Sequence, residues 1–112
     1  MDERDRGAHL GRATLAGHGV GLARSRKARD GTHVESLWVH PAYRGWGVAT
    51  RLLHELLWIE REHGVTQLFV WVFDSNTAAQ SLYRHLGFKP TERRPITDGR
   101  IEVRLEIRLD AD

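Results

Sequence analysis

The apolar and polar positions in the first half of the chain predict three short strands followed by one long helix. Apolar runs bounded by glycine or proline predict the strands, at residues 10–16, 20–25 and 33–39. The third strand stops at His40-Pro41, because the residue before a proline is steered away from the helical conformation. Apolar residues then recur at intervals of three and four from Val48 to about His63, which predicts an amphipathic helix that Gly64 ends.

The second half of the chain predicts a buried strand, a shorter helix and a final strand with one solvent-exposed face. Gln67 to Phe73 is an almost unbroken apolar run, typical of a strand buried on both faces. Asn76 offers a capping oxygen to a helix that Gly87 ends, and Phe88-Lys-Pro starts a short strand or turn. In the tail, apolar residues at 101, 103, 105, 107 and 109 alternate strictly with charged residues.

The elements follow in the order β-β-β-α-β-α-β-β, which predicts an α/β or α+β fold with one mixed sheet and two main helices. A strand, a helix and a strand in succession imply a parallel pair of strands at the centre of the sheet. We expect residues 1–112 to form a single domain, because 112 residues is the size of one small domain. The arginines and lysine at 24, 26, 27 and 29 are interpreted as part of a solvated loop.

Composition excludes several classes of function. Without cysteine there is no thiol nucleophile, disulfide or cysteine-based zinc site, and the histidines lack metal-ligand spacing, so we expect no metal. The net charge of +2 weakly suits an anionic ligand, and the absence of a dense basic stripe argues against a nucleic-acid partner. Leu68 to Phe73 is the longest apolar run and is too short to cross a membrane, and the amino end resembles no secretory signal. We therefore expect a cytoplasmic protein without a membrane partner.

A glycine-containing loop, Arg44-Gly-Trp-Gly-Val-Ala49, connects the third strand to the long helix. Free backbone N–H groups and the positive end of the helix dipole meet at such a loop, which predicts an anion site. Gly45 and Gly47 let the backbone approach an anion closely. The loop lacks the Lys-Ser/Thr pair of nucleotide triphosphatases and the third glycine of a dinucleotide site, so a different anion is indicated. An ordinary glycine turn before a helix is the alternative.

Residues 37–49, together with Asn76 and residues 82–88, resemble the GNAT superfamily of acyl-CoA N-acyltransferases. The arginine-x-x-glycine-x-alanine loop and the asparagine-to-tyrosine-glycine-phenylalanine element occur in the family's order and spacing, and the resemblance covers approximately residues 10–109. It implies acetyl-CoA as acyl donor and an unidentified amine as acceptor. Family members normally begin with a strand and one or two helices that wall the acceptor pocket, and only about nine residues precede the expected hairpin here.

The resemblance also implies a set of site residues. Binding of acetyl-CoA is assigned to Leu37, Trp38, Val39, Arg44, Gly45, Trp46, Gly47, Val48, Ala49, Thr50, Asn76 and Tyr83. The Val39 N–H would hydrogen-bond the thioester carbonyl and favour the oxyanion. Tyr83 would be the acid that returns a proton to the departing thiolate, since a phenol of pKa about 10 can protonate a thiolate whose conjugate pKa is about 8.5. A tyrosine half in the core is the alternative for Tyr83.

An ammonium acceptor must lose a proton before it attacks, which requires a base or a chain of water molecules. Glu35 is the first candidate, because the two-residue period of a strand places it on the same face as Leu37 and Val39. His33 lies one step further along that face. The alternatives are a salt-bridged rim carboxylate for Glu35 and a plain surface residue for His33.

Three functions stay open at this point. The first is an N-acetyltransferase that uses acetyl-CoA and a primary amine. The second is an acyl-CoA-binding module without catalysis, and the third and weakest is an arginine-rich domain associated with nucleic acid. We also expect a homodimer, because an abbreviated sheet leaves apolar surface and the alternating final strand is able to pair across an interface.

Overall fold

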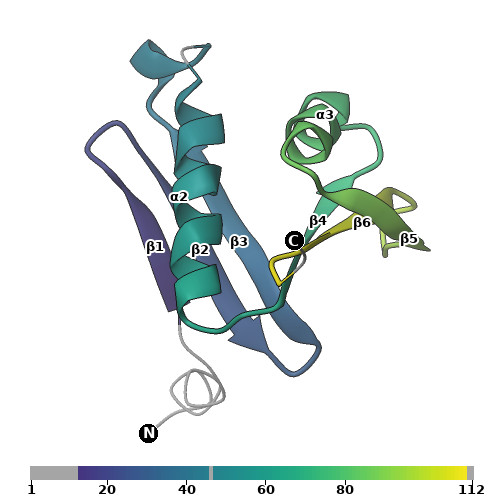
Figure 1. Ribbon diagram of the computed structural model, residues 1–112. Helices are drawn as coiled ribbons and strands as arrows, with labels where there is room; N and C mark the ends of the chain where they lie inside the picture. The colour runs from purple at the N-terminus through teal and green to yellow at the C-terminus, as the bar shows by residue number, and fades with distance from the viewer. Residues whose placement is uncertain (1–12, 46, 111–112) are drawn as a thin grey trace, which may run out of the picture.

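The computed structural model describes residues 13–45 and 47–110 (Figure 1). Its elements are β1 (Ala13–His18), β2 (Gly21–Ala28), β3 (Gly31–Val39), η1 (Pro41–Tyr43), α2 (Val48–Glu62), β4 (Gln67–Phe73), α3 (Thr77–His85), β5 (Lys89–Pro95) and β6 (Ile101–Arg108). This order confirms the predicted succession of strands and helices. The expected fold class, an α/β sheet with two main helices, is confirmed as well.

The strands form one six-stranded mixed sheet in the order β1-β2-β3-β4-β6-β5. The β3–β4 pair is parallel, as the helical crossover through α2 requires, and the other neighbours are antiparallel. The parallel pairing is short, because it joins only Thr32 to Leu68 and His33 to Phe69. Beyond these two pairs the strands diverge toward η1 on one side and α3 on the other (Figure 1).

One face of the sheet packs against α2 and α3 and forms the apolar core. The buried apolar residues of this core are Ala23, Val34, Leu52, Leu53, Leu56, Leu68, Val70, Tyr83, Phe88, Val103, Leu105 and Leu109. Both helices contribute to it, α2 through its leucines and α3 through Tyr83. The alternation of the tail is confirmed from Val103 to Leu109, whose apolar side chains lie in or against this core, whereas Ile101 is 38% exposed. The opposite face is less wet than predicted, since the side chains of Glu102, Arg104 and Glu106 are only 19%, 17% and 18% exposed.

The centre of β4 is buried on both faces, as its apolar run predicts. Leu68 and Val70 join the core, whereas Phe69 points to the opposite face and is still only 3% exposed. Side chains cover it there: the His33 ring stacks on Phe69 at 5.5 Å, and the Arg104 guanidinium lies 3.7 Å from its ring centroid. The second face of β4 is thus protected by an aromatic ring and a cation.

Two sequence expectations about strands are wrong. Arg24 and Arg26 lie within β2 rather than in a solvated loop, because the β2–β3 hairpin stays paired as far as Ala28 and Gly31. The alternating final strand β6 is hydrogen-bonded to β4 on one side and to β5 on the other. No free edge of β6 remains to pair across a dimer interface, because the segment after Phe88 forms β5 and occupies it.

In the described residues, no helix is long and apolar enough to cross a membrane.

Candidate functional site

The divergence of β3 and β4 opens a cavity of about 320 Å³ between these strands and α3. Glu35 and Leu37 line it from β3, Val70 and Val72 from β4, and Tyr83 from α3. Asn76, at the start of α3, lines it as well. The structure therefore brings both predicted catalytic residues and part of the predicted binding set to one cavity.

The β3 edge of this cavity carries free backbone N–H groups. The His40 N–H donates to the Val20 carbonyl of the neighbouring segment at 2.7 Å, and antiparallel strands exchange hydrogen bonds at every second residue. The Val39 N–H therefore points away from β2, toward β4, and the same alternation turns the Leu37 N–H that way. Because the β3–β4 pairing ends at His33, neither N–H has a backbone partner among the described residues.

The predicted anion loop forms a second cavity, of about 290 Å³, at the end of β3. Val39, Arg44, Gly45, Gly47 and Ala49 are among its lining residues. Gly47 is the N-cap of α2 with a φ of 76°, a left-handed conformation that glycine adopts readily. The first backbone bond of α2 runs from the Arg51 N–H to the Gly47 carbonyl, so the N–H groups of the first turn have no partner within the helix.

This helix end has the features of an anion site. No side chain caps the start of α2, and its first turn holds no acidic residue. Uncapped N–H groups and the positive end of the helix dipole both attract a negative group. Thr50, in this first turn, is partly buried. An ordinary glycine turn, the alternative interpretation, is compatible with the same geometry.

Arg44 and Asn76 have structural partners as well as places at the site. The Arg44 Nε donates to the Val39 carbonyl at 3.2 Å, which ties the loop to the end of β3. The Asn76 Oδ1 accepts from the Ala79 N–H at 3.1 Å and caps α3, as its position in the sequence predicts. The side-chain amide of Asn76 remains a hydrogen-bond donor next to the cavity.

Tyr83 is almost fully buried, which is deeper than the half-buried tyrosine considered as the alternative from the sequence. It is 4% exposed and packs edge-to-face on Phe88 at 5.1 Å. Burial raises the pKa of Tyr83 to about 12, because the phenolate would lose its hydration. The Tyr83 phenol is thus a weaker acid than an unperturbed tyrosine and stays neutral at physiological pH, where it can donate a hydrogen bond.

Glu35 lies on the face opposite to the predicted one. In the register, Arg24 pairs with Ser36 and Ser25 pairs with Val34, so Glu35 is the extra residue of a β-bulge. Glu35 and Ser36 consequently both point away from the core, whereas Leu37 and Val39 pack against it. The two-residue period fails here, because an inserted residue shifts every later side chain to the other face.

The bulge gives Glu35 two ion-pair partners. Its Oε2 lies 3.0 Å from the Arg24 Nε and its Oε1 lies 2.9 Å from the Arg26 Nε. Glu35 is therefore a salt-bridged carboxylate, as the alternative interpretation of the sequence proposed. The sequence alone did not identify Arg24 and Arg26 as neighbours of the site. Their alternation with apolar or small residues is the pattern that would have placed them in a strand, β2, beside β3.

Three further sequence candidates occupy peripheral positions or lie outside the description. His33 shares the face of Glu35, and its ring packs on Phe69. Trp38 is 46% exposed and makes an edge contact with His40. Trp46 lies outside the described residues.

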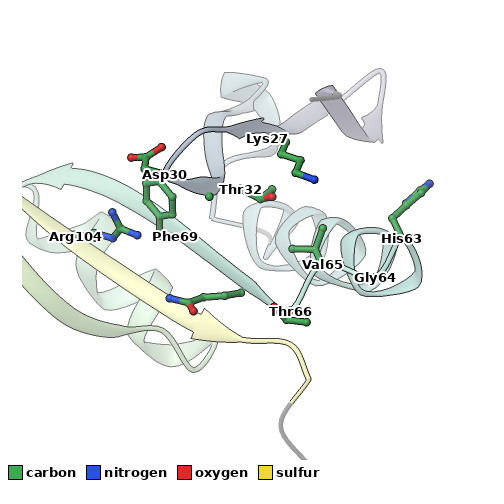
Figure 2. Close-up of a pocket in the computed structure, with 11 residues that line it drawn as sticks. Lys27, Asp30, Thr32, His63, Gly64, Val65, Thr66, Phe69 and Arg104 are labelled. Carbon is green, nitrogen blue, oxygen red and sulfur yellow. The ribbon is translucent and has the colours of Figure 1, made fainter. Parts of the chain in front are cut away.

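A separate pocket of about 340 Å³ lies at the other end of the sheet, near the end of α2 (Figure 2). Its lining includes Lys27, Thr32, His63 and Arg104, with Arg104 beside Phe69. None of the site residues predicted from the sequence lines this pocket. The two cavities at the divergent ends of β3 and β4 are therefore the candidate site.

The burial of Tyr83 predicts that its phenol loses its proton at a higher pH than an exposed tyrosine does. The chain has two tyrosines, so a Tyr43→Phe variant leaves Tyr83 as the only phenol, and its ultraviolet absorbance should change with a midpoint of about pH 12. Between pH 10 and 12 an unfolded chain ionises while the folded protein keeps its proton, so the free energy of unfolding should fall by about 2 to 3 kcal/mol. A midpoint near pH 10, in protein whose circular dichroism is still native, would contradict the burial.

Comparisons with known proteins agree with this geometry. Residues 2–88 match the model of the acetyltransferase (GNAT) family. The N-alpha-acetyltransferase RimI of Mycobacterium tuberculosis is 40% identical over 84 residues, which cover 74% of this chain and 50% of that protein. The thialysine N-epsilon-acetyltransferase of Bos taurus is 33% identical over 55 residues, 49% of this chain and 32% of that protein. The chain thus spans between a third and a half of the length of these curated relatives.

Solved structures share the fold at low sequence identity. A ribosomal-protein alanine N-acetyltransferase from Escherichia coli superposes with a TM-score of 0.74 at 24% identity, covering 100% of this chain and 79% of that one. A Salmonella typhimurium protein described as an acetyltransferase, solved with acetyl-CoA, gives 0.75 at 22% identity and covers 100% and 76%. The arrangement of the sheet and the match of the family model lead to one conclusion: the chain belongs to the GNAT family of acetyltransferases.

Proposed function

We propose that this protein is an N-acetyltransferase that moves an acetyl group from acetyl-CoA to a primary amine by direct attack. The observation that carries the proposal is the short β3–β4 pairing, which leaves the Val39 N–H unpaired between the bare end of α2 and Tyr83. Family membership and the acetyl-CoA-bound relative support the choice of acyl donor.

In this proposal the two cavities hold two parts of the acyl donor. The pyrophosphate lies at the N-terminus of α2, where the N–H groups of Gly45, Gly47 and the first helical turn surround it and Arg44 adds a positive charge. The pantetheine arm runs along the open edge of β3 and bonds the backbone of Leu37 and Val39. The side-chain amide of Asn76 and the hydroxyl of Tyr83 then lie beside the thioester end.

The chemistry assigned to the chain is acyl transfer to nitrogen. The amine lone pair attacks the thioester carbonyl carbon, a C–N bond forms, and the Val39 N–H donates to the oxygen that becomes negative. The C–S bond then breaks and its electron pair leaves on sulfur, which receives a hydrogen bond from the Tyr83 hydroxyl. The nitrogen loses one proton before attack, and Glu35, the carboxylate that lines the cavity, accepts it directly or through water and later releases it to solvent. The nitrogen loses a second proton as the amide forms. This proton reaches the sulfur through water, or through the Tyr83 hydroxyl, which gives its own proton to the sulfur and takes one back.

A non-catalytic acyl-CoA-binding module is the second candidate, and one observation favours it. A phenol with a pKa of about 12 is a poorer acid toward a thiolate, whose conjugate thiol has a pKa of about 8.5, than the unperturbed phenol that the sequence suggests. Hydrogen bonding by a neutral Tyr83 does not require full proton transfer before the C–S bond breaks, and for this reason we favour the enzyme.

The binding half of the proposal predicts the effect of a side chain at Gly47. Gly47→Val should lower the affinity for acetyl-CoA by about tenfold or more in calorimetric titration, because the side chain enters the space assigned to the pyrophosphate. Gly64→Val is the matched control. Both glycines have a positive φ, 76° and 82°, and at both an added Cβ meets no heavy atom within 4 Å. Equal affinities of the two variants would contradict the assignment of the loop.

The catalytic half predicts that Tyr83→Phe loses turnover and keeps the acyl donor. The variant retains the ring that packs on Phe88 and loses only the hydroxyl. Thiol release from acetyl-CoA with a panel of primary amines should slow by about 10-fold to 100-fold, while calorimetric affinity for acetyl-CoA changes little. Full activity in Tyr83→Phe would remove the hydroxyl from the mechanism, and wild-type protein that binds acetyl-CoA without thiol release would favour the binding module.

A further inference from the structure

Glu35 is the only carboxylate among the described residues that line the cavity between β3 and β4, and it is shared by two cations. One carboxylate against two guanidinium groups leaves this cluster, Arg24, Arg26 and Glu35, with a net charge of +1. The side chains of Arg24, Arg26 and Glu35 are 37%, 34% and 31% exposed. Of the three, Glu35 lines the cavity itself, and the two arginines lie against its carboxylate. The cluster is therefore an accessible positive group at the edge of the proposed acyl-transfer site.

The hydrogen-bonding capacity of the two arginines is not used up by Glu35. Each carboxylate oxygen contacts one Nε atom, so neither guanidinium is held by both oxygens in a two-pronged pair. The Arg24 Nε is shielded from solvent and makes no hydrogen bond of good geometry, although it lies 3.0 Å from Glu35. A guanidinium has five N–H donors, so both arginines keep donors for a second anion.

Other arginines near this face of the sheet differ in their charge balance. Arg94, Arg100 and Arg104 lie over the rings of Trp71, Phe73 and Phe69. Each of them has a carboxylate of its own, respectively Glu102, Asp98 and Glu106. These pairs are electrically neutral, in contrast to the cluster of Arg24, Arg26 and Glu35. An anionic ligand is therefore drawn to the cluster and not to the pairs.

We propose that Arg24 and Arg26 select acceptor amines that carry a carboxylate or phosphate group a few bonds from the nitrogen to be acetylated. A simple ammonium ion is repelled by the net positive charge of the cluster. An acceptor that also carries an anion places its ammonium group at Glu35 and its anion on the free donors of the two arginines. This inference rests on the proposed acetyltransferase function and adds a substrate class to it.

The test compares amines that differ only in the anionic group. Ethanolamine is paired with phosphoethanolamine, and butylamine is paired with γ-aminobutyrate, so that phosphate and carboxylate are tested separately. For the wild-type protein we expect kcat/KM for the anionic member of at least one pair to exceed that of the neutral member by about tenfold or more. Arg24→Gln and Arg26→Gln should each bring this ratio close to one, because each removes donors to the anion.

Arg100→Gln is the matched control, since it removes one positive charge from a pair with its own carboxylate, and it should keep the wild-type ratio. A wild-type ratio near one for both pairs, with all amines acetylated, would overturn the selection and leave the proposed function standing. A complete lack of thiol release would count against the proposed function instead. Calorimetry with phosphoethanolamine and CoA-loaded protein then decides the selection, and equal affinity in wild type and Arg26→Gln would overturn it.

Discussion

The limited hydrogen bonding between β3 and β4 is the constraint on which the rest of the site depends. Two residue pairs hold the parallel strands together, and beyond His33 and Phe69 the strands separate. An exposed strand edge inside a sheet normally carries unpaired backbone groups at a free-energy cost, unless water or a ligand satisfies them. Here the open edge includes the N–H groups of Leu37 and Val39, which in the proposed function bond the pantetheine arm of acetyl-CoA. The two cavities of the candidate site lie along this edge.

The two helices that follow the divergent strands supply the remaining groups of the candidate site. α2 follows β3 through the glycine loop and brings an uncapped N-terminus to the end of the open edge. α3 follows β4, starts at the Asn76 cap and packs Tyr83 into the core beneath the gap. The proposed anion site and the neutral hydroxyl thus come from two strand-to-helix connections, β3 to α2 and β4 to α3, and the row of backbone donors comes from the open edge of β3. The leucines of α2 fix this arrangement because they bury one face of the sheet.

The sequence was sufficient for the order of elements, the helix ends and the position of the glycine loop before α2, because these depend on periodicity, caps and glycine positions within short segments. It was not sufficient for the side on which Glu35 lies. A β-bulge depends on how β2 and β3 pair across the hairpin, and no periodic pattern within β3 reports it. For the same reason Arg24 and Arg26 were not recognised as its partners. The pKa of Tyr83 likewise depends on burial by residues distant in the sequence, and the partners of β6 depend on a strand of charged residues and prolines that has little apolar pattern.

Amide hydrogen exchange at Leu37 and Val39, followed residue by residue by NMR, tests the central claim most directly. The claim is that these two N–H groups lie in a strand, lack a partner and receive one from acetyl-CoA. In the free protein they should exchange quickly while the Trp38 N–H between them, which faces β2, exchanges slowly. Addition of acetyl-CoA should slow exchange at both positions. Slow exchange at Leu37 and Val39 in the free protein, or no change on addition of acetyl-CoA, would contradict the account.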